Sequence, residues 1–214
     1  MLIGRPTKFY TGIEIFGDSI DLRELYTVNG DLIECVDEVQ KDFLLTLNYE
    51  VRKAYDGHRE HGVFGIDSEI KYFGFKMIWP QFLFVVAQLR RLAKWQPTTA
   101  RQHATLFRLE SIIEGALKVA DIRIGTEVWD AFRGLDDMPP NYLTGFIESV
   151  NFDYACSGST GKLRFKRLPA MLHSLNWMSE GYRLYASKVE ALAKAQNRQP
   201  AEIEFEYPWT DFKW

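Results

Sequence analysis

The sequence predicts an α+β fold, with a small and mostly antiparallel sheet beside a larger helical part. Two short segments rich in β-branched and aromatic residues, near 9–17 and 69–79, are typical of strands. Most of the remaining chain repeats apolar residues at helical spacing. Strands do not alternate regularly with single helices, which argues against a parallel α/β sheet. We expect a single domain over 1–214, in which the helical middle, about 80–150, is a candidate subdomain.

Terminal residues indicate where the individual helices begin and end. Asp, Ser and Thr cap helix starts, Pro fits the first turn, and Gly ends a helix. The expected boundary residues, in chain order, are Asp18, Gly57, Pro80, Thr98 or Thr99, Gly134, Pro140 and Ser179. The helix after Thr98 or Thr99 has one clear apolar face. That face is formed by Leu106, Leu109, Ile113, Ala116, Leu117 and Ala120.

The overall composition excludes some functions. Hydrophobic residues make up 46% of the 214 residues and aromatic residues 14%, enough for a sizeable core. The formal net charge of −3 gives no overall attraction to nucleic acid or to an anionic membrane. The most apolar window, 75–89, contains Lys76 and Pro80 and is too short and broken to span a bilayer. We therefore expect no membrane contact.

The two cysteines and the first ten residues bear on the compartment. Cys35 and Cys156 do not make a disulfide framework, and Cys35 falls inside a helical pattern. The stretch "MLIGRPTKFY" lacks the apolar run of a secretory signal. We expect reduced thiols in a cytoplasmic protein.

The stretch "CSGSTGKLRFKR", at 156–167, looks at first like a phosphate-binding loop. A P-loop has Gly, four residues, then Gly-Lys and a hydroxyl residue. Here Cys156 occupies the first Gly position and Leu163 occupies the hydroxyl position. The alternation in "KLRFKR" also favours a strand over the helix whose N-terminus would attract the anion. A nucleotide P-loop is therefore not expected.

A β-hairpin is the preferred interpretation of the same stretch. With a four-residue loop at 157–160, Asp153 would lie opposite Arg164 and Asn151 opposite Lys166. The aromatic residues on either side would then share the other face. A slip by one residue would place Asp153 beside an apolar residue, so this register is the one that the pattern favours.

Motifs for metal binding or nucleophilic catalysis are weak. His58 and His61 lie in a polar loop with acidic neighbours, but zinc sites need three or four ligands with supporting spacing. Cys156 has no histidine partner that the sequence reveals, and no Gly-x-Ser-x-Gly motif occurs. We expect no metal and no cofactor, with His58 and His61 as the weak metal candidates.

Two groups of basic residues are candidates for a binding surface. Together they would offer an acidic partner or a nucleic acid a positive face. The first group flanks the turn at 96–99 and consists of Arg90, Arg91, Lys94, Arg101 and Arg108. The second group lies on one face of the predicted hairpin strand and consists of Lys162, Arg164 and Lys166, with Arg167 beside them. We favour the other interpretation, a solvated surface that the 29 acidic residues balance, because the net charge of −3 gives no overall field to support binding.

The last stretch, "EIEFEYPWTDFKW", alternates acidic and apolar residues and then becomes strongly aromatic. The alternation predicts a final strand with one polar face. The candidate interface residues are Tyr207, Trp209, Phe212 and Trp214. Large exposed apolar patches are limited in monomers, so we favour docking of these rings on their own domain. The alternative is an interface with a partner or a second copy.

Three segments together resemble a known family: "TGIEIFGDSIDLRELY", "YFGFKMIWPQFLF" and "EIEFEYPW". The chain is similar to an uncharacterised bacterial family that is known only as a domain of unknown function. The resemblance covers most of the chain and implies a single bacterial cytoplasmic domain. Its motifs are structural, so it assigns no catalytic or binding residue.

Without a catalytic motif, we expect a non-enzymatic interaction or regulatory protein. Its expected partner is a second copy of the chain or another protein. One alternative is a nucleic-acid-binding protein that uses the basic groups, which we favour less. Another is an enzyme with dispersed acidic residues.

Overall fold

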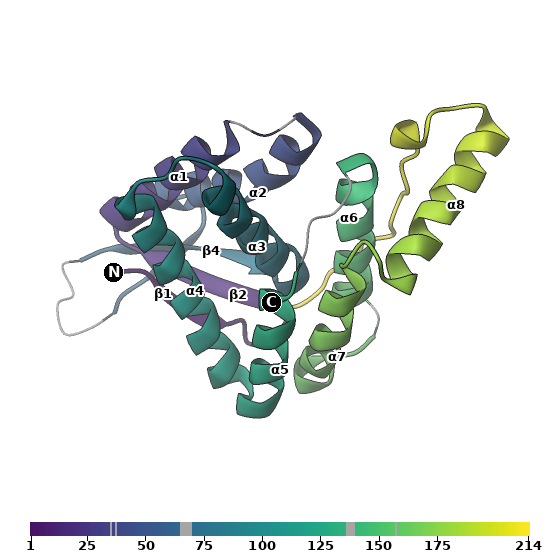
Figure 1. Cartoon of the computed structure of the whole chain (residues 1–214). Coiled ribbons are helices and arrows are strands. Elements are labelled where there is room, and N and C mark those ends of the chain that lie inside the picture. The colour runs from purple at the N-terminus through teal and green to yellow at the C-terminus, as the bar shows by residue number, and fades with distance from the viewer. Residues whose placement is uncertain (35, 37, 65–69, 136–139, 157) are drawn as a thin grey trace.

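The computed structural model describes residues 1–34, 36, 38–64, 70–135, 140–156 and 158–214. Within these ranges the fold is α+β, as predicted, with one antiparallel sheet and eight α-helices (Figure 1). The strands are β1 (Ile3–Pro6), β2 (Gly12–Gly17), β3 (Glu60–Gly62) and β4 (Tyr72–Ile78). The helices are α1 (Ser19–Ile33), α2 (Glu38–Tyr55), α3 (Trp79–Trp95), α4 (Ala100–Ala120), α5 (Ile122–Arg133), α6 (Pro140–Cys156), α7 (Gly161–Ser174) and α8 (Glu180–Gln196), followed by a 3₁₀ turn, η1 (Pro200–Glu202).

The sheet has the strand order β1-β2-β4-β3, and every neighbouring pair is antiparallel. Ile13 lies opposite Met77, and Ile15 lies opposite Phe75. All four side chains are buried on one face of the sheet. Because side chains alternate along a strand, the residues between them face the other way.

The opposite face carries a row of charges across all four strands. Arg5 Nε lies 2.7 Å from Glu14 Oε2, and Lys76 Nζ lies 3.3 Å from Glu14 Oε1. Lys76 Nζ also lies 2.9 Å from Glu60 Oε1. Cross-strand pairs of opposite charge favour one register. The sheet therefore has an apolar face that helices cover and a charged face.

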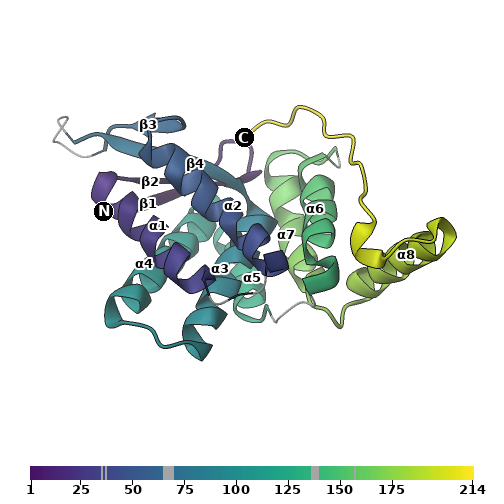
Figure 2. The same cartoon turned by 90° about the horizontal axis from the view of Figure 1, so that it is seen from above.

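The helices surround the apolar face and extend beyond it. Figures 1 and 2 show α1–α5 around the sheet, with α6, α7 and α8 to one side. A continuous cluster of buried side chains runs from Leu2 in the first strand region to Tyr182 on α8. Within the described residues, none of the helices combines the length and the apolar composition that crossing a membrane requires. The number of domains stays a prediction.

Most of the predicted helix boundaries are confirmed. Asp18 caps α1 through its side chain, and Thr99 caps α4 in a capping box with Gln102. Ser179 caps α8, and Gly134 follows the last residue of α5. Each residue predicted for the apolar face of α4 is buried. These local signals act within one helical turn, so the sequence alone reveals them.

The predicted hairpin at 151–166 is wrong. Residues 140–156 form α6 and residues 161–174 form α7, so Asp153 does not face Arg164 across strands. Phe165, Leu168 and Leu172 are all buried on α7, with helical spacing. A short alternating stretch fits a helix as well as a strand. Here the apolar residues repeat at helical spacing over a longer stretch, and this favours the helix. Asp153 Oδ2 instead lies 2.7 Å from an Nη atom of Arg167.

One of the expected departures from a P-loop is absent. The segment after Gly161 is a helix, so the expected strand no longer counts against phosphate binding. Cys156 and Leu163 still depart from the motif, and the preceding element is a helix rather than a strand. Residue 157, in the middle of this connection, lies outside the described residues.

The predicted final strand is also wrong. Residues 203–214 form no helix or strand. Ile203, Phe205 and Tyr207 are nevertheless half-buried, and the Glu residues between them are exposed. Alternation reports which way side chains face along an extended chain. It does not require a neighbouring strand to hydrogen-bond with.

Two strands were not predicted. β1 lies in the stretch "IGRP", and β3 lies in the segment that we expected to be a polar loop. Both are edge strands of three or four residues, too short to show a clear period. Cys35, which the pattern places in a helix, lies outside the described residues.

Candidate functional site

A hollow of about 760 Å³ lies where α3, α4 and α5 meet. The residue Trp177, in the turn between α7 and α8, contributes to its wall. We call this hollow the basic–aromatic pocket. It is lined by Ala87, Arg90, Arg91, Lys94, Trp95, Phe107, Glu110, Trp129, Phe132, Arg133, Leu135 and Trp177.

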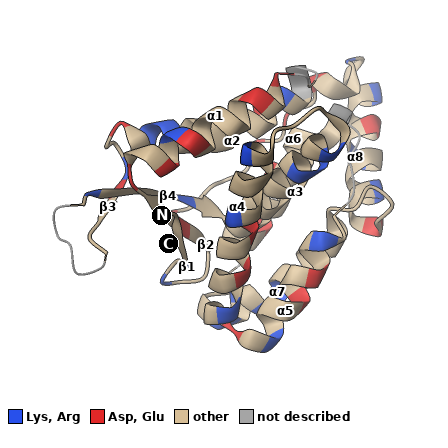
Figure 3. Cartoon of the chain, turned by 60° about the vertical axis from the view of Figure 1, so that its left-hand side comes forward, with Lys and Arg blue, Asp and Glu red and all other residues tan. Residues whose placement is uncertain are grey.

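The amphipathic pattern of α3 places its basic residues in this pocket. Leu89 and Ala93 face the core and are buried. Arg90, Arg91 and Lys94 lie between and beyond them in the last turns, on the side that borders the pocket. Figure 3 shows Lys and Arg in blue on both α3 and α4. The predicted basic residues of α3 are thus brought together by a single helix.

Arg90 is held in place by two residues of α4. Its Nε lies 3.0 Å from Glu110 Oε1, and its Cζ lies 3.8 Å from the centroid of the Phe107 ring. Burial raises the pKa of Glu110 above its ordinary value, and the charges of Arg90 and Arg133 oppose that shift. The guanidinium of Arg90 is therefore fixed between a ring face and a carboxylate.

Several large rings of the pocket are open to solvent. The exposed fractions are 73% for Trp95, 56% for Phe107 and 46% for Trp177. Trp129 is half-buried, and its ring centroid lies 5.2 Å from that of the buried Phe132. Large apolar side chains gathered around a concave surface are typical of a binding site, whereas single exposed ones are ordinary.

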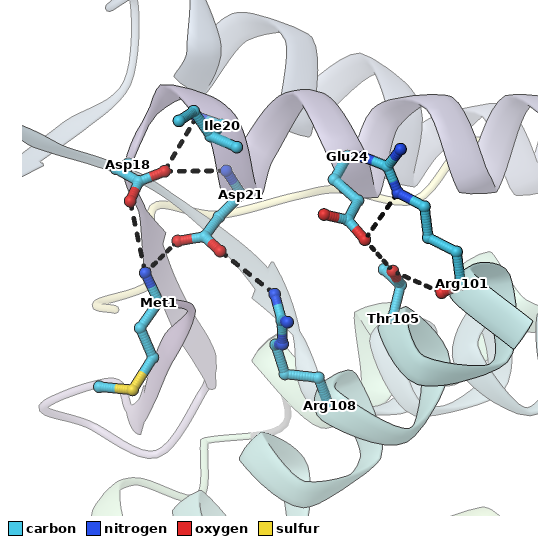
Figure 4. Close-up of polar contacts among 8 residues, drawn as sticks. All are labelled: Met1, Asp18, Ile20, Asp21, Glu24, Arg101, Thr105 and Arg108. Carbon is cyan, nitrogen blue, oxygen red and sulfur yellow. Dashed lines mark hydrogen bonds and ion pairs between the residues drawn. The ribbon is translucent and has the colours of Figure 1, made fainter.

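Arg101 and Arg108 lie on α4 but do not line the pocket. Arg101 Nε lies 3.4 Å from Glu24 Oε1, and an Nη atom of Arg108 lies 3.2 Å from Asp21 Oδ1. Figure 4 shows both side chains reaching from α4 to α1, where the amino terminus of Met1 also pairs with Asp21. Their charges are partly neutralised, and they connect two helices.

The second predicted basic group does not form one face. Lys162 and Lys166 are exposed on α7, but Arg164 is only 4% exposed. Arg164 donates hydrogen bonds to the hydroxyl of Thr11 and, at 2.9 Å, to the carbonyl of Ala155. Placing Arg164 on a basic surface is therefore wrong. On a helix, residues two apart point in different directions, so Arg164 points away from Lys162 and Lys166, which are four apart and share a face.

The two metal candidates are not supported by further ligands. His61 Nε2 lies 3.1 Å from the carbonyl oxygen of Gly57, and the His61 ring packs edge-on against Phe73. His58 is exposed in the turn before β3. Among the described residues, no three His, Cys, Asp or Glu side chains are grouped so that they could hold a metal ion.

The aromatic C-terminal residues pack against the same chain. Phe212 and Trp214 contact the buried cluster, and the carbonyl of Trp214 accepts a hydrogen bond from the backbone N–H of Phe9 at 3.3 Å. An unbroken series of ring contacts continues from the tail to α6 and α8. In order, the rings are Trp214, Phe212, Trp209, Phe152, Tyr207, Phe205, Tyr185, Phe146, Tyr182 and Tyr142. A contact of these residues with a partner stays a prediction.

Sequence reasoning missed part of the pocket. The sequence did not predict Glu110, Trp129, Arg133 and Trp177 as site residues. Trp129 and Arg133 are four residues apart on α5 and share a face. The sequence shows this spacing, but only tertiary packing brings this face of α5 against α3 and α4.

The fold and the pocket together define an α+β protein with a basic–aromatic pocket formed mainly by three helices. Comparison with known families shows which family the chain belongs to. The chain belongs to the family described as Domain of unknown function (DUF6904), whose model matches residues 2–214. No curated protein and no solved structure shows significant similarity to the chain.

Proposed function

We propose that this protein binds a small organic anion that carries a planar ring, and that the basic–aromatic pocket holds this ligand. The proposal rests on the residues that line this pocket. Four cationic side chains and five aromatic rings surround one hollow of about 760 Å³. Such a volume is typical of sites for small molecules. The protein is then a binding protein, in line with the interaction or regulatory role expected from the sequence.

The charges of the pocket favour an anion. Arg90, Arg91, Lys94 and Arg133 line it together with one carboxylate, Glu110. Guanidinium groups present a planar fork that matches a phosphate or a carboxylate, and a lysine adds a compact positive charge. Because Arg90 is already fixed against Phe107 and Glu110, little side-chain entropy is lost when it contacts a ligand.

The rings of the pocket favour a planar ligand. Trp95, Phe107 and Trp177 keep large exposed surfaces beside the cationic groups. Stacking of a planar ring on such a surface stabilises a complex without requiring a particular pattern of hydrogen bonds. A ligand that combines a ring with a charge would use both features at once, as a nucleotide does.

An extended nucleic-acid surface has less support. Figure 3 shows blue and red segments interspersed over the helices rather than separated. Arg164 is buried, and Arg101 and Arg108 are paired with acidic residues of α1. With a net charge of −3, the local pocket rather than the whole surface would attract an anion.

The test is a titration of the intrinsic tryptophan fluorescence with adenosine monophosphate. Adenosine provides the ring without the charge, and inorganic phosphate provides the charge without the ring. We expect saturable quenching by adenosine monophosphate and at least about tenfold weaker binding of either control, because each loses one set of contacts. An aromatic carboxylate extends the panel. Failure of every ring-bearing anion to bind at millimolar concentration would overturn the proposal.

Two charge reversals show whether binding occurs in the pocket. Lys94→Glu changes a lining residue, and Arg101→Glu makes the same change of net charge on an exposed residue outside the lining. We expect the first variant to weaken binding about tenfold or more and the second to leave it within about twofold. Equal losses would indicate a general charge effect. Salt-sensitive binding of an oligonucleotide that Lys162→Glu with Lys166→Glu abolishes would instead favour the nucleic-acid alternative.

A further inference from the structure

A second hollow, of about 720 Å³, lies between α6, α8 and the extended C-terminal segment. Figure 1 shows this segment, in yellow, running from the end of α8 past α6 toward the C-terminus. We call the hollow the acidic–aromatic groove. It is lined by Tyr142, Thr144, Gly145, Glu148, Tyr185, Val189, Pro200, Ala201, Ile203, Glu204, Phe205, Glu206, Tyr207 and Trp209.

The charges of the groove are opposite to those of the basic–aromatic pocket. Glu148, Glu204 and Glu206 contribute exposed carboxylates. Among the described residues that line the groove, none is Lys, Arg or His. The two hollows therefore differ in the sign of the charge that they attract, and a ligand of one is disfavoured in the other.

The aromatic walls of the groove are held by packing. The ring centroids of Tyr185 and Phe205 are 5.7 Å apart, and those of Phe205 and Tyr207 are 6.3 Å apart. The hydroxyl of Tyr185 lies so close to Gly145 that a Cβ atom at this position would overlap it. Gly145 thus lets a ring of α8 approach α6 closely. The rings are positioned before any ligand arrives.

A cation of the chain itself already uses one of these rings. Lys188 Nζ, on α8, lies 4.8 Å from the centroid of Phe205. Such distances are typical of attraction between a cation and the negative face of an aromatic ring. Burial raises the pKa of Tyr185, and the nearby Tyr207 and Glu148 add to this shift. The phenol therefore stays neutral at physiological pH, and the carboxylates supply the negative charge.

We propose that the acidic–aromatic groove binds a small organic cation with an alkylated ammonium head. Alkylated ammonium ions are weakly hydrated and make favourable contacts with several ring faces at once. A metal ion would instead need several oxygen ligands in a defined geometry. Within the described residues no such group of ligands is found. This inference is independent of the anion proposed for the other hollow.

The test uses choline as the probe and NMR of its methyl protons as the readout. Rings around a bound ammonium head shift these protons upfield, which ordinary ion pairing does not do. The matched control is 3,3-dimethylbutan-1-ol, in which carbon replaces the charged nitrogen of choline. We expect choline to bind at least about tenfold more tightly than this neutral analogue. Equal binding of both, or no choline binding at millimolar concentration, would overturn the proposal.

Variants place the binding in the groove. Glu148→Gln combined with Glu204→Gln should weaken choline binding about tenfold, whereas Glu127→Gln on α5 should not change it. Tyr207→Phe keeps the ring face and should retain most of the affinity, whereas Tyr207→Leu should lose it. Melting temperatures of all variants show whether each one folds. If the Tyr207→Leu and Tyr207→Phe variants are folded and bind choline equally well, the aromatic walls are not the site.

Discussion

The guanidinium carbon of Arg90 lies 3.8 Å from the centroid of the Phe107 ring, so that α3 and α4 meet through a cation and a ring face. Phe107 is 56% exposed despite its size. Its position is explained by the contact with Arg90 and by the pocket that both residues line. Together with the ion pair between Arg90 and Glu110, this contact orients the guanidinium group.

Replacing Phe107 should therefore affect binding more than folding. In Phe107→Leu we expect the free energy of unfolding to change by less than about 1 kcal/mol, because the ring is largely exposed. Affinity for adenosine monophosphate should fall about 3- to 10-fold through loss of stacking. Val119→Ala on the same helix, 75% exposed, is the control and should change neither quantity. A large loss of stability with unchanged affinity would contradict this prediction.

Glu110 and Glu24 should show opposite pH dependence in stability. Burial raises the pKa of Glu110 above its ordinary value of 4.5. The contribution of Glu110 to the free energy of unfolding is therefore present at low pH and is lost as the pH rises through the folded pKa. Hydrogen bonds from Thr105 and Arg101 lower the pKa of Glu24, despite partial burial. Its contribution is present at neutral pH and is lost as the pH falls.

Urea unfolding near pH 7 and near pH 4 measures this difference. The quantity compared is the free energy of unfolding of each variant minus that of the unmodified protein. For Glu110→Gln this difference should be more positive near pH 7 than near pH 4. For Glu24→Gln it should be more negative near pH 7 than near pH 4. The same slope in both variants would show that the environments of the two carboxylates do not differ as the structure indicates.

Arg164 and Thr11 should be energetically coupled although they are 153 positions apart. Arg164 is buried, burial lowers its pKa, and it donates to Thr11 and Ala155. We expect Arg164→Met and Thr11→Val each to lower the free energy of unfolding by about 2–4 kcal/mol. A double-mutant cycle should give a coupling of about 1.5–3 kcal/mol, the range for hydrogen bonds to charged groups. A coupling near zero would mean that the two residues act separately.

The C-terminal tail should stabilise the fold through Trp214. Its ring packs against Phe212 and lies close to Gly12 of β2. Trp214→Ala should lower the free energy of unfolding by about 1–2 kcal/mol, because the side chain is half-buried. Trp95→Ala, at 73% exposure, should stay within about 0.5 kcal/mol.

Light scattering on the same variants tests the predicted interface. If Trp214→Ala lowers stability and leaves the mass unchanged, the tail acts within its own chain. If Trp214→Ala leaves stability unchanged and converts an oligomer into a monomer, the tail rings serve a second copy instead, and the stability prediction fails.

Features that depend on neighbouring residues could be predicted from the sequence. Asp18, Thr99 and Ser179 each cap a helix within one turn of their own position. The helical spacing of apolar residues in α4 predicts which of its faces is buried. The fold class follows from these elements and from the two longer strands, β2 and β4. Arg90, Arg91 and Lys94 could also be predicted as a group, because one helix carries them.

Features that depend on distant residues follow from the packing of the folded chain. The stretch at 161–167 fits a strand or a helix, and burial of Phe165 and Leu168 favours the helix. Arg164 reaches Thr11 rather than solvent, and the alternating tail docks by its rings on α6 and α8 without a partner strand. The basic–aromatic pocket joins three consecutive helices with the distant Trp177, and the acidic–aromatic groove joins α6, α8 and the C-terminal segment. Local propensity does not predict these contacts between elements, because they arise from the packing of whole helices.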